Sequence, residues 1–269
     1  MEVSSISEYE LPLSNGQKLL AEINGLKIVD YNGEISLLNS QGISMWSSPF
    51  KFEGKANQAF ISKDRLLLTT DTNDYHAWGI LGPAFLIDLK DGSLVAKLRG
   101  ESGASLKNGS FILGLEGYGC FKTWLYDRNG KLVQEWRSYG HYIVGENDDI
   151  RVLECDRRDP TESRLVRLKK DGQIEKGQIL NDSQIGKPLV LGDSSIFFID
   201  YGVIRIVDLN LKEQFKKVLM KISLKDSCRF NSYLQFKNKK ILVDIYEETK
   251  STSAKFTKHS WLIDFSYKS

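Results

Sequence analysis

The sequence predicts an all-β fold, a single β-propeller domain over residues 1–269 with about six four-stranded blades. Two observations predict it. A hairpin pattern of turn, apolar strand, second turn and outgoing strand recurs about six times along the chain, at intervals near the roughly 40 to 45 residues that a four-stranded blade occupies. No segment sustains the 3.6-residue apolar period of a helix.

The first copy of the hairpin defines the pattern. Asn32 and Gly33 form a two-residue turn before an alternating strand at residues 34–38, a second turn ends at Gly42, and Trp46 closes the copy. The later copies are recognised by their second turns or by their apolar strand, at Gly92, Gly130, Gly172, Leu211 and residues 261–265.

Strand-like runs between the copies supply the inner strands of the blades. They lie at residues 18–23, 65–70, 110–115, 150–154, 195–199 and 240–245. The last copy ends before its outgoing strand, while the alternating stretch at residues 5–13 has no partner of its own. We therefore expect this N-terminal strand to pair with the last blade and close the ring, because a closed ring leaves no open sheet edge.

Aspartates recur at one position of the repeat, where the apolar strand meets the turn. Because short acidic side chains accept hydrogen bonds from nearby backbone N–H groups, these residues are expected to cap turns and not to perform catalysis. They are Asp88, Asp127, Asp208 and Asp264.

The combination of Gly33, an apolar strand, Gly42 and Trp46 resembles the repeat of quinoprotein-like and WD40-like β-propellers. The resemblance covers most of the chain as a pattern and implies architecture only, because propellers of this type have many roles. The quinone-dependent dehydrogenases of that family are larger, secreted and bind a cofactor. This shorter chain is therefore not expected to share their activity.

Composition places the chain among globular proteins with an apolar core, since 41% of residues are hydrophobic and 27% charged. Three cysteines form no CxxC pair, which favours reduced thiols. The first residues are acidic and polar, unlike a secretory signal, and no apolar run approaches the ~20 residues that cross a bilayer. We expect a cytoplasmic protein that is not embedded in a membrane.

The charge is unevenly distributed. Residues 164–240 contain 16 Lys and Arg against 8 Asp and Glu, although the formal net charge of the chain is only +2. Such a stretch can attract an acidic partner. The favoured interpretation is a solvated set of strand edges, because lysines on outer strands also discourage sheets from aggregating.

Three connections on the predicted functional face are longer than a hairpin needs, at residues 71–81, 155–163 and 247–259. Aromatic residues in the first suggest a recognition anchor, unless that loop packs them inward. Arginines in the second can bind carboxylate or phosphate, unless they pair with neighbouring aspartates. The third is small and polar, and we assign it no role. The candidate partner-binding residues are Tyr75, His76, Trp78, Tyr118, Arg157 and Arg158.

No catalytic, metal-binding or cofactor motif stands out, so no catalytic residue, metal or cofactor is expected. His76, His141 and His259 lack metal-ligand spacing. Gly114, Gly117 and Gly119 reverse the order of the dinucleotide-binding motif.

The sequence therefore favours a non-catalytic propeller that binds a protein through one loop face. One version is an immunity-type protein that neutralises a toxin domain. Nucleic acid ranks lower as a partner, because a net charge of +2 supports it weakly. The alternative is a hydrolase or lyase with carboxylates of Asp74, Glu116 and Asp156 at the channel mouth.

Overall fold

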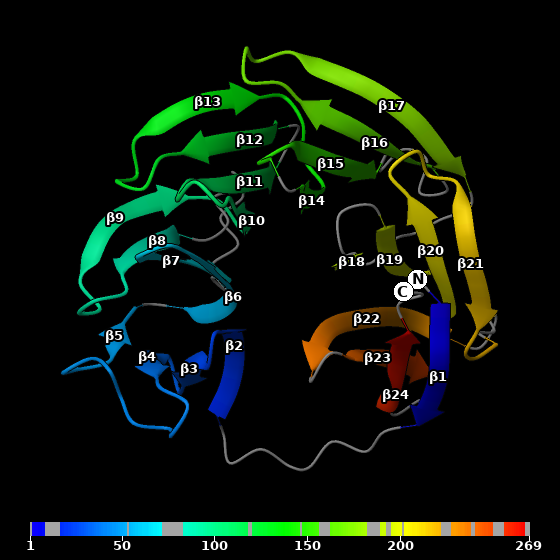
Figure 1. The fold of residues 1–269 in the computed structure, drawn as a ribbon, viewed down its shortest axis with the longest axis horizontal. Helices are drawn as coiled ribbons and strands as arrows, with labels where there is room; N and C mark the ends of the chain where they lie inside the picture. The colour runs from blue at the N-terminus through cyan, green and yellow to red at the C-terminus, as the bar shows by residue number, and fades with distance from the viewer. Residues whose placement is uncertain are drawn as a thin grey trace. The chain divides into compact units, whose positions relative to one another are not determined.

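The structure is a computed structural model, and in the part of the chain that it describes the regular elements are six antiparallel sheets of four strands (Figure 1). It describes residues 2–8, 17–52, 54–71, 83–117, 120–145, 147–155, 162–181, 189–191, 195–200, 202–221, 227–237, 240–249 and 256–266. This confirms the all-β class. In the described part of the chain, no helix is long and apolar enough to cross a membrane.

The chain divides into two units, which we describe separately. The larger unit consists of Ser14–Glu154 and Val166–Lys176, and the smaller unit of Met1–Leu13, Cys155–Leu165 and Gly177–Ser269. The expectation of a single domain stays a prediction.

Three sheets lie wholly within the larger unit and follow chain order. The first contains β2 (Gln17–Ile23), β3 (Leu26–Tyr31), β4 (Glu34–Leu38) and β5 (Phe50–Lys51). The second contains β6 (Lys55–Ser62), β7 (Arg65–Asp71), β8 (Pro83–Asp88) and β9 (Leu94–Arg99). The third contains β10 (Ser102–Ser105), β11 (Phe111–Gly117), β12 (Cys120–Tyr126) and β13 (Leu132–Trp136). Neighbouring sheets meet at their first strands, since β2 contacts β6 and β6 contacts β10.

The remaining sheets repeat the same order, except that the last one recruits the first strand of the chain. The fourth contains β14 (His141–Val144), β15 (Ile150–Cys155), β16 (Glu162–Leu168) and β17 (Ile174–Asn181). The fifth contains β18 (Leu189–Leu191), β19 (Ser195–Asp200), β20 (Val203–Asp208) and β21 (Glu213–Val218). The sixth has the order β1-β24-β23-β22, with β1 (Glu2–Glu8), β22 (Ser227–Lys237), β23 (Lys240–Thr249) and β24 (Phe256–Ser266).

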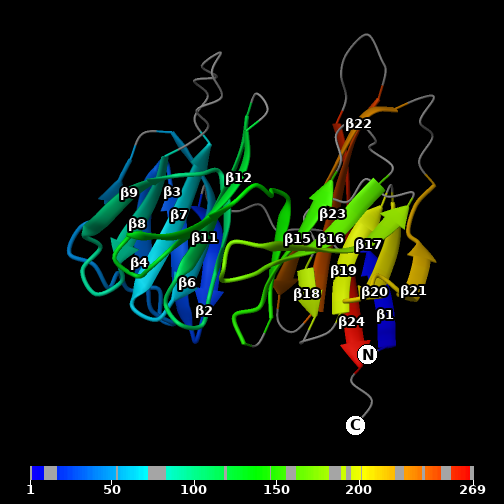
Figure 2. The same ribbon diagram turned by 90° about the horizontal axis from the view of Figure 1, so that it is seen from above.

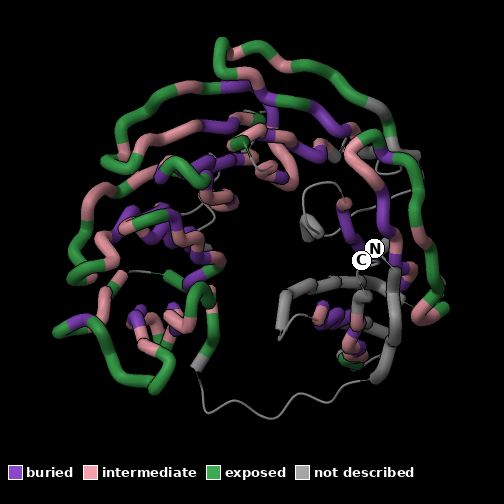
Figure 3. Tube along the Cα trace, viewed as in Figure 1, coloured by how far each residue is buried: buried purple, intermediate pink, exposed green. Residues whose placement is uncertain are grey.

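The core lies on the central strands of each sheet, and outer strands such as β9 and β13 are largely exposed (Figure 3). The strand β7 explains why the apolar run in the sequence is continuous. Leu66 and Leu68 pack in a cluster with residues of the first sheet, whereas Leu67 packs with Phe111 and Leu113 of the third. Both faces of the second sheet are therefore buried, which favours apolar residues at successive positions.

The N-terminal strand pairs with the C-terminal sheet, as the sequence predicted. In the antiparallel pairing of β1 with β24, Glu2 lies opposite Ser266 and Glu8 opposite Trp261. The strand begins earlier than the predicted residues 5–13. Closure of a ring stays a prediction.

Three of the four recurring aspartates cap turns, as predicted. The Oδ1 atoms of Asp88, Asp127 and Asp208 each accept the backbone N–H two residues ahead, at 2.9, 2.9 and 2.8 Å. Asp264 has another contact, an ion pair with Lys240 at 2.9 Å.

The predicted bounds of the loop at residues 247–259 are wrong. Strand β23 continues to Thr249 and β24 begins at Phe256, so the connection is shorter than predicted (Figure 2). Pairing persists to Glu248 opposite Phe256. The sequence missed this extension because a backbone ladder can continue through polar residues that carry no apolar alternation.

Candidate functional site

The candidate site lies at what we call the loop edge of a sheet, the edge where the second and third strands are joined. Residues 72–82 join β7 to β8, residues 118–119 join β11 to β12, and residues 156–161 join β15 to β16. The opposite edge, where the first strand joins the second and the third joins the fourth, is called the turn edge.

All six predicted partner-binding residues fall in these three connections and lie outside the described residues, so their roles stay predictions. They are Tyr75, His76, Trp78, Tyr118, Arg157 and Arg158. Asp74 and Asp156 of the enzymatic alternative also lie outside, whereas Glu116 is described on β11.

A polar network supports the loop edge of the third sheet. Glu101 precedes β10, and its Oε1 accepts hydrogen bonds from the Tyr139 hydroxyl at 2.8 Å and from the Glu116 backbone N–H at 3.2 Å. The Glu101 carbonyl accepts a third bond from the Asn57 side chain at 3.1 Å. Because Asn57 lies on β6 and Glu116 on β11, this one residue connects the second and third sheets.

The network continues to the fourth sheet. Thr123 of β12 is fully buried and shares a hydrogen bond with the Tyr142 hydroxyl of β14 at 2.8 Å. The Thr123 hydroxyl also donates to the carbonyl of Ser138, whose own hydroxyl donates to Glu154 Oε1 at 2.6 Å. The strand end that precedes residues 156–161 is therefore held by side-chain hydrogen bonds.

Burial raises the pKa of both tyrosines above its ordinary value, and the negative charge of Glu101 raises it further. Tyr139 and Tyr142 therefore stay neutral at physiological pH. They serve as hydrogen-bond donors and not as general bases.

Gly114 makes room for these tyrosines. A Cβ at this position would lie 1.8 Å from the Tyr142 hydroxyl oxygen and 2.9 Å from a ring carbon of Tyr139. Only glycine allows so close an approach. In the sequence, Gly114 stands out only as part of a possible nucleotide-binding motif, and no local pattern indicates this contact.

Phe121 is a candidate that the sequence analysis missed. It is 42% exposed on β12, directly opposite Glu116 and near the residues that join β11 to β12. Phe121 is thus a described side chain that can offer apolar surface near the start of β12.

The histidines do not form a site in the described structure. His141 begins β14, His259 lies on β24 with its ring stacked on Trp261 at 6.0 Å between centroids, and His76 is outside the described residues. Where side chains are described, no group of three or more His, Cys, Asp or Glu residues could hold a metal ion.

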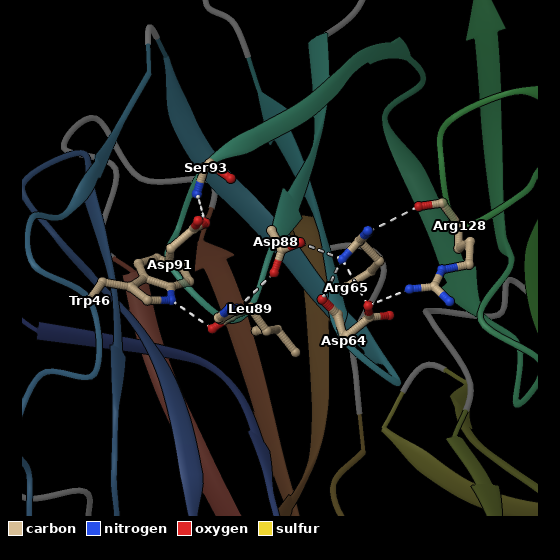
Figure 4. Close-up of polar contacts among 9 residues, drawn as sticks. Trp46, Asp64, Arg65, Asp88, Leu89, Asp91, Ser93 and Arg128 are labelled. Atoms are coloured by element: carbon tan, nitrogen blue, oxygen red, sulfur yellow. Dashed lines mark hydrogen bonds and ion pairs between the residues drawn. The ribbon is translucent and has the colours of Figure 1, made fainter.

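The turn edge of the larger unit is fastened by tryptophans (Figure 4). The Trp46 indole N–H donates to the Leu89 carbonyl of the next sheet at 2.9 Å. Trp136 repeats the contact, donating to the Lys169 carbonyl at 2.9 Å. The tryptophan that closes a repeat therefore docks on the turn of the following repeat.

Charged residues fasten the same edge. Arg65 pairs with Asp88 at 2.6 Å, and its Nε donates to the Arg128 carbonyl at 3.1 Å (Figure 4). Asp64 forms an ion pair with Arg128. The Arg65 side chain is only 11% exposed, so its pair with Asp88 is largely shielded from water, whereas Asp64 and Arg128, which join the second and third sheets, are about half-exposed.

Comparison with known proteins identifies the architecture. No protein-family model and no curated protein matches the sequence. Among solved structures, Kluyveromyces lactis Hsv2 superposes with a TM-score of 0.55 at 9% identity, over 93% of this chain and 87% of that one. The WD40 domain of SCAP from fission yeast gives 0.51 at 12% identity, over 95% and 77%. KlAtg21, in a complex with the coiled-coil of AgAtg16, gives 0.56 at 8% identity, over 87% and 81%.

The chain has a β-propeller-like architecture. This confirms the resemblance that the repeat pattern indicated. At these identities the likeness shows the fold alone, and function has to be argued from the site.

Proposed function

We propose that this chain is a non-catalytic, β-propeller-like module that binds a protein partner through its loop edges. One asymmetry carries the proposal. Apart from residues 39–49, which include Trp46, the turn edge of the larger unit consists of connections of five residues or fewer, held by tryptophan, aspartate and arginine contacts. The loop edges carry the longer connections, at residues 72–82 and 156–161. Long loops on a rigid scaffold are where binding residues concentrate.

The proposed contacts are those expected from the sequence, Tyr75, His76, Trp78, Tyr118, Arg157 and Arg158, together with Phe121. Tyr, Trp and Arg are the residue types that dominate binding energy at protein interfaces. The buried network around Glu101 and Tyr142 supports the proposal, because it holds the strand ends beside these loops and so lowers the entropy lost on binding.

A structural neighbour supports a protein as the partner class, since KlAtg21 forms a complex with a coiled-coil. The more specific version, an immunity-type protein that neutralises a toxin in the cytoplasm, rests on the sequence arguments alone. We propose a cytoplasmic location on the same grounds.

The test is affinity capture followed by titration of the purified partner. The Trp78→Ala, Arg157→Ala double variant is expected to raise the dissociation constant at least tenfold. Truncating an interface anchor of these residue types costs about 2 kcal/mol or more of binding free energy. The matched control is Lys90→Ala with Lys131→Ala, two exposed turn-edge residues. All proteins are compared at equal thermal stability.

A partner that binds the loop variant as tightly as the wild type would contradict the proposal. So would turnover of a small molecule that is abolished by replacing Asp74, Glu116 and Asp156, because that result would favour the hydrolase or lyase alternative.

A further inference from the structure

A basic strip lies on and just beyond the outer strand of the fifth sheet, β21, and consists of Lys212, Lys216, Lys217 and Lys221. All four side chains are exposed. In the described part of the chain, none of the four takes part in an ion pair. Lysines of other sheets do pair across strands, for example Lys51 with Glu34 at 2.7 Å.

The two described carboxylates closest in sequence to the basic strip have other partners. Asp208 Oδ1 accepts the backbone N–H groups of Asn210 and Lys212, at 2.8 and 3.0 Å, and so holds the turn before β21. Glu213 pairs with Arg205 at 3.0 Å. The positive charge of the strip is therefore not neutralised by its own strand or by the turn.

The strip also lies on an open sheet edge. Strand β21 is last in the order β18-β19-β20-β21, so it pairs with β20 on one side and with no described strand on the other. Val218, 52% exposed, adds an apolar side chain to the same strand. An unpaired edge of this kind offers backbone N–H and C=O groups to another extended chain.

The spacing of the lysines defines what can pair there. Lys216 and Lys217 are adjacent on β21, so their side chains project to opposite faces of the sheet. Lys212 and Lys221 lie just beyond the two ends of β21. An added neutral or basic strand would bring no compensating charge, whereas an acidic strand would place carboxylates opposite lysines on both faces.

We propose that β21 is a second docking site, at which an acidic extended segment of a protein partner adds as a fifth strand. Pairing is expected along the six residues of β21, roughly 20 Å at about 3.3 Å per residue, and a segment of about ten residues extends past both ends of the strand, where Lys212 and Lys221 lie. Its carboxylates occupy consecutive positions, so that both faces of the added strand are acidic. This site is separate from the loop edges and does not depend on the function proposed for them.

Fluorescence anisotropy of the full chain with a labelled synthetic peptide tests the site. The probe is a peptide of about ten residues, rich in Glu and Val, with glutamates on both faces. Binding is expected to weaken on the order of tenfold between 50 and 200 mM NaCl, because exposed charge pairs are screened by salt. Replacing all four lysines by glutamine is expected to weaken binding on the order of tenfold or more.

Two controls separate strand addition from simple charge attraction. The first is a protein variant that loses the same number of exposed lysines elsewhere, at Lys90, Lys107, Lys131 and Lys170, and it is expected to bind like the wild type. The second is a peptide of the same charge with proline at alternate positions, which cannot form the ladder and is expected not to bind.

Equal loss in both lysine variants would overturn the proposal, as would equal binding of the proline peptide or of a single-stranded oligonucleotide. Absence of peptide binding at low salt would overturn it too. Circular dichroism confirms that each variant is folded. The Trp78→Ala, Arg157→Ala variant is expected to bind the peptide normally, so failure at one surface is distinguishable from failure at the other.

Discussion

Gly114 has no side chain, and the space that a Cβ would need is occupied by the hydroxyl of Tyr142 at 1.8 Å. We predict that Gly114→Ala destabilises the fold by about 1–3 kcal/mol or more, because overpacking forces buried groups to shift. Gly145→Ala is the matched control, since its Cβ would have no neighbour nearer than 3.5 Å. Urea unfolding measures both, and equal stability of the two variants would contradict the contact.

The same two tyrosines predict how stability changes with pH. Their pKa values in the fold are raised above the ordinary value near 10. Their stabilising effect is therefore fully present below pH 10 and is lost as pH rises above it, because the unfolded chain ionises first. The expected loss is about 1.4 kcal/mol per pH unit for each tyrosine.

Unfolding in urea at several values between pH 9 and pH 11.5 measures this loss. The Tyr139→Phe, Tyr142→Phe variant serves as the comparison, because it keeps the lysines that also titrate in this range. It is expected to lose less stability with rising pH than the wild type. If the free energy of unfolding falls equally with pH in both proteins, the loss does not come from these two tyrosines.

At the level of elements, the docking of Trp46 on the next sheet gives a clean comparison of two turn glycines. Gly92 and Gly42 have nearly the same backbone conformation, with φ of +78° and +81°. A Cβ at Gly92 would lie 2.8 Å from the Trp46 ring, whereas one at Gly42 would meet nothing within 4 Å.

We predict that Gly42→Ala costs about 1–2 kcal/mol, the penalty of left-handed backbone for alanine. Gly92→Ala is expected to cost about 1–3 kcal/mol more, because it also displaces the indole. Thermal unfolding of the two single variants and of Trp46→Phe measures the difference. A Gly92→Ala variant as stable as Gly42→Ala would show that the indole contact contributes nothing.

The elements also show where sequence analysis succeeds. Turns such as the one capped by Asp88 were predicted because their hydrogen bonds reach only a few residues along the chain. The close contact at Gly114 and the Glu101 network were not predicted, because the residues that meet there are far apart in the sequence. Phe121 escaped notice because exposure cannot be read from a strand pattern. The residues proposed from composition, such as Trp78, still rest on the sequence.

At the scale of the whole molecule, one element joins the two ends of the sequence. Strand β1 (Glu2–Glu8) forms the outer strand of a sheet whose other three strands come from residues 227–266. No local pattern specifies this pairing. It was predictable only because the last repeat lacked a strand and the N-terminal stretch lacked a partner. Its contribution to stability can be measured separately from that of the remaining strands.

Deletion of residues 2–8 is expected to destabilise the sixth sheet by about 3 kcal/mol or more, because six register pairs with β24 are lost and each net hydrogen bond contributes about 1 kcal/mol. Faster hydrogen exchange in Phe256–Ser266 is the expected result, whereas removal of residues 267–269 is the control. A synthetic peptide of residues 1–13, added in excess, should restore protection because it binds only the folded edge. Unchanged exchange after the deletion would mean that β1 contributes no stability to the sheet. If the deletion lowers protection and the peptide does not restore it, β1 stabilises the sheet only when it is covalently attached to the chain.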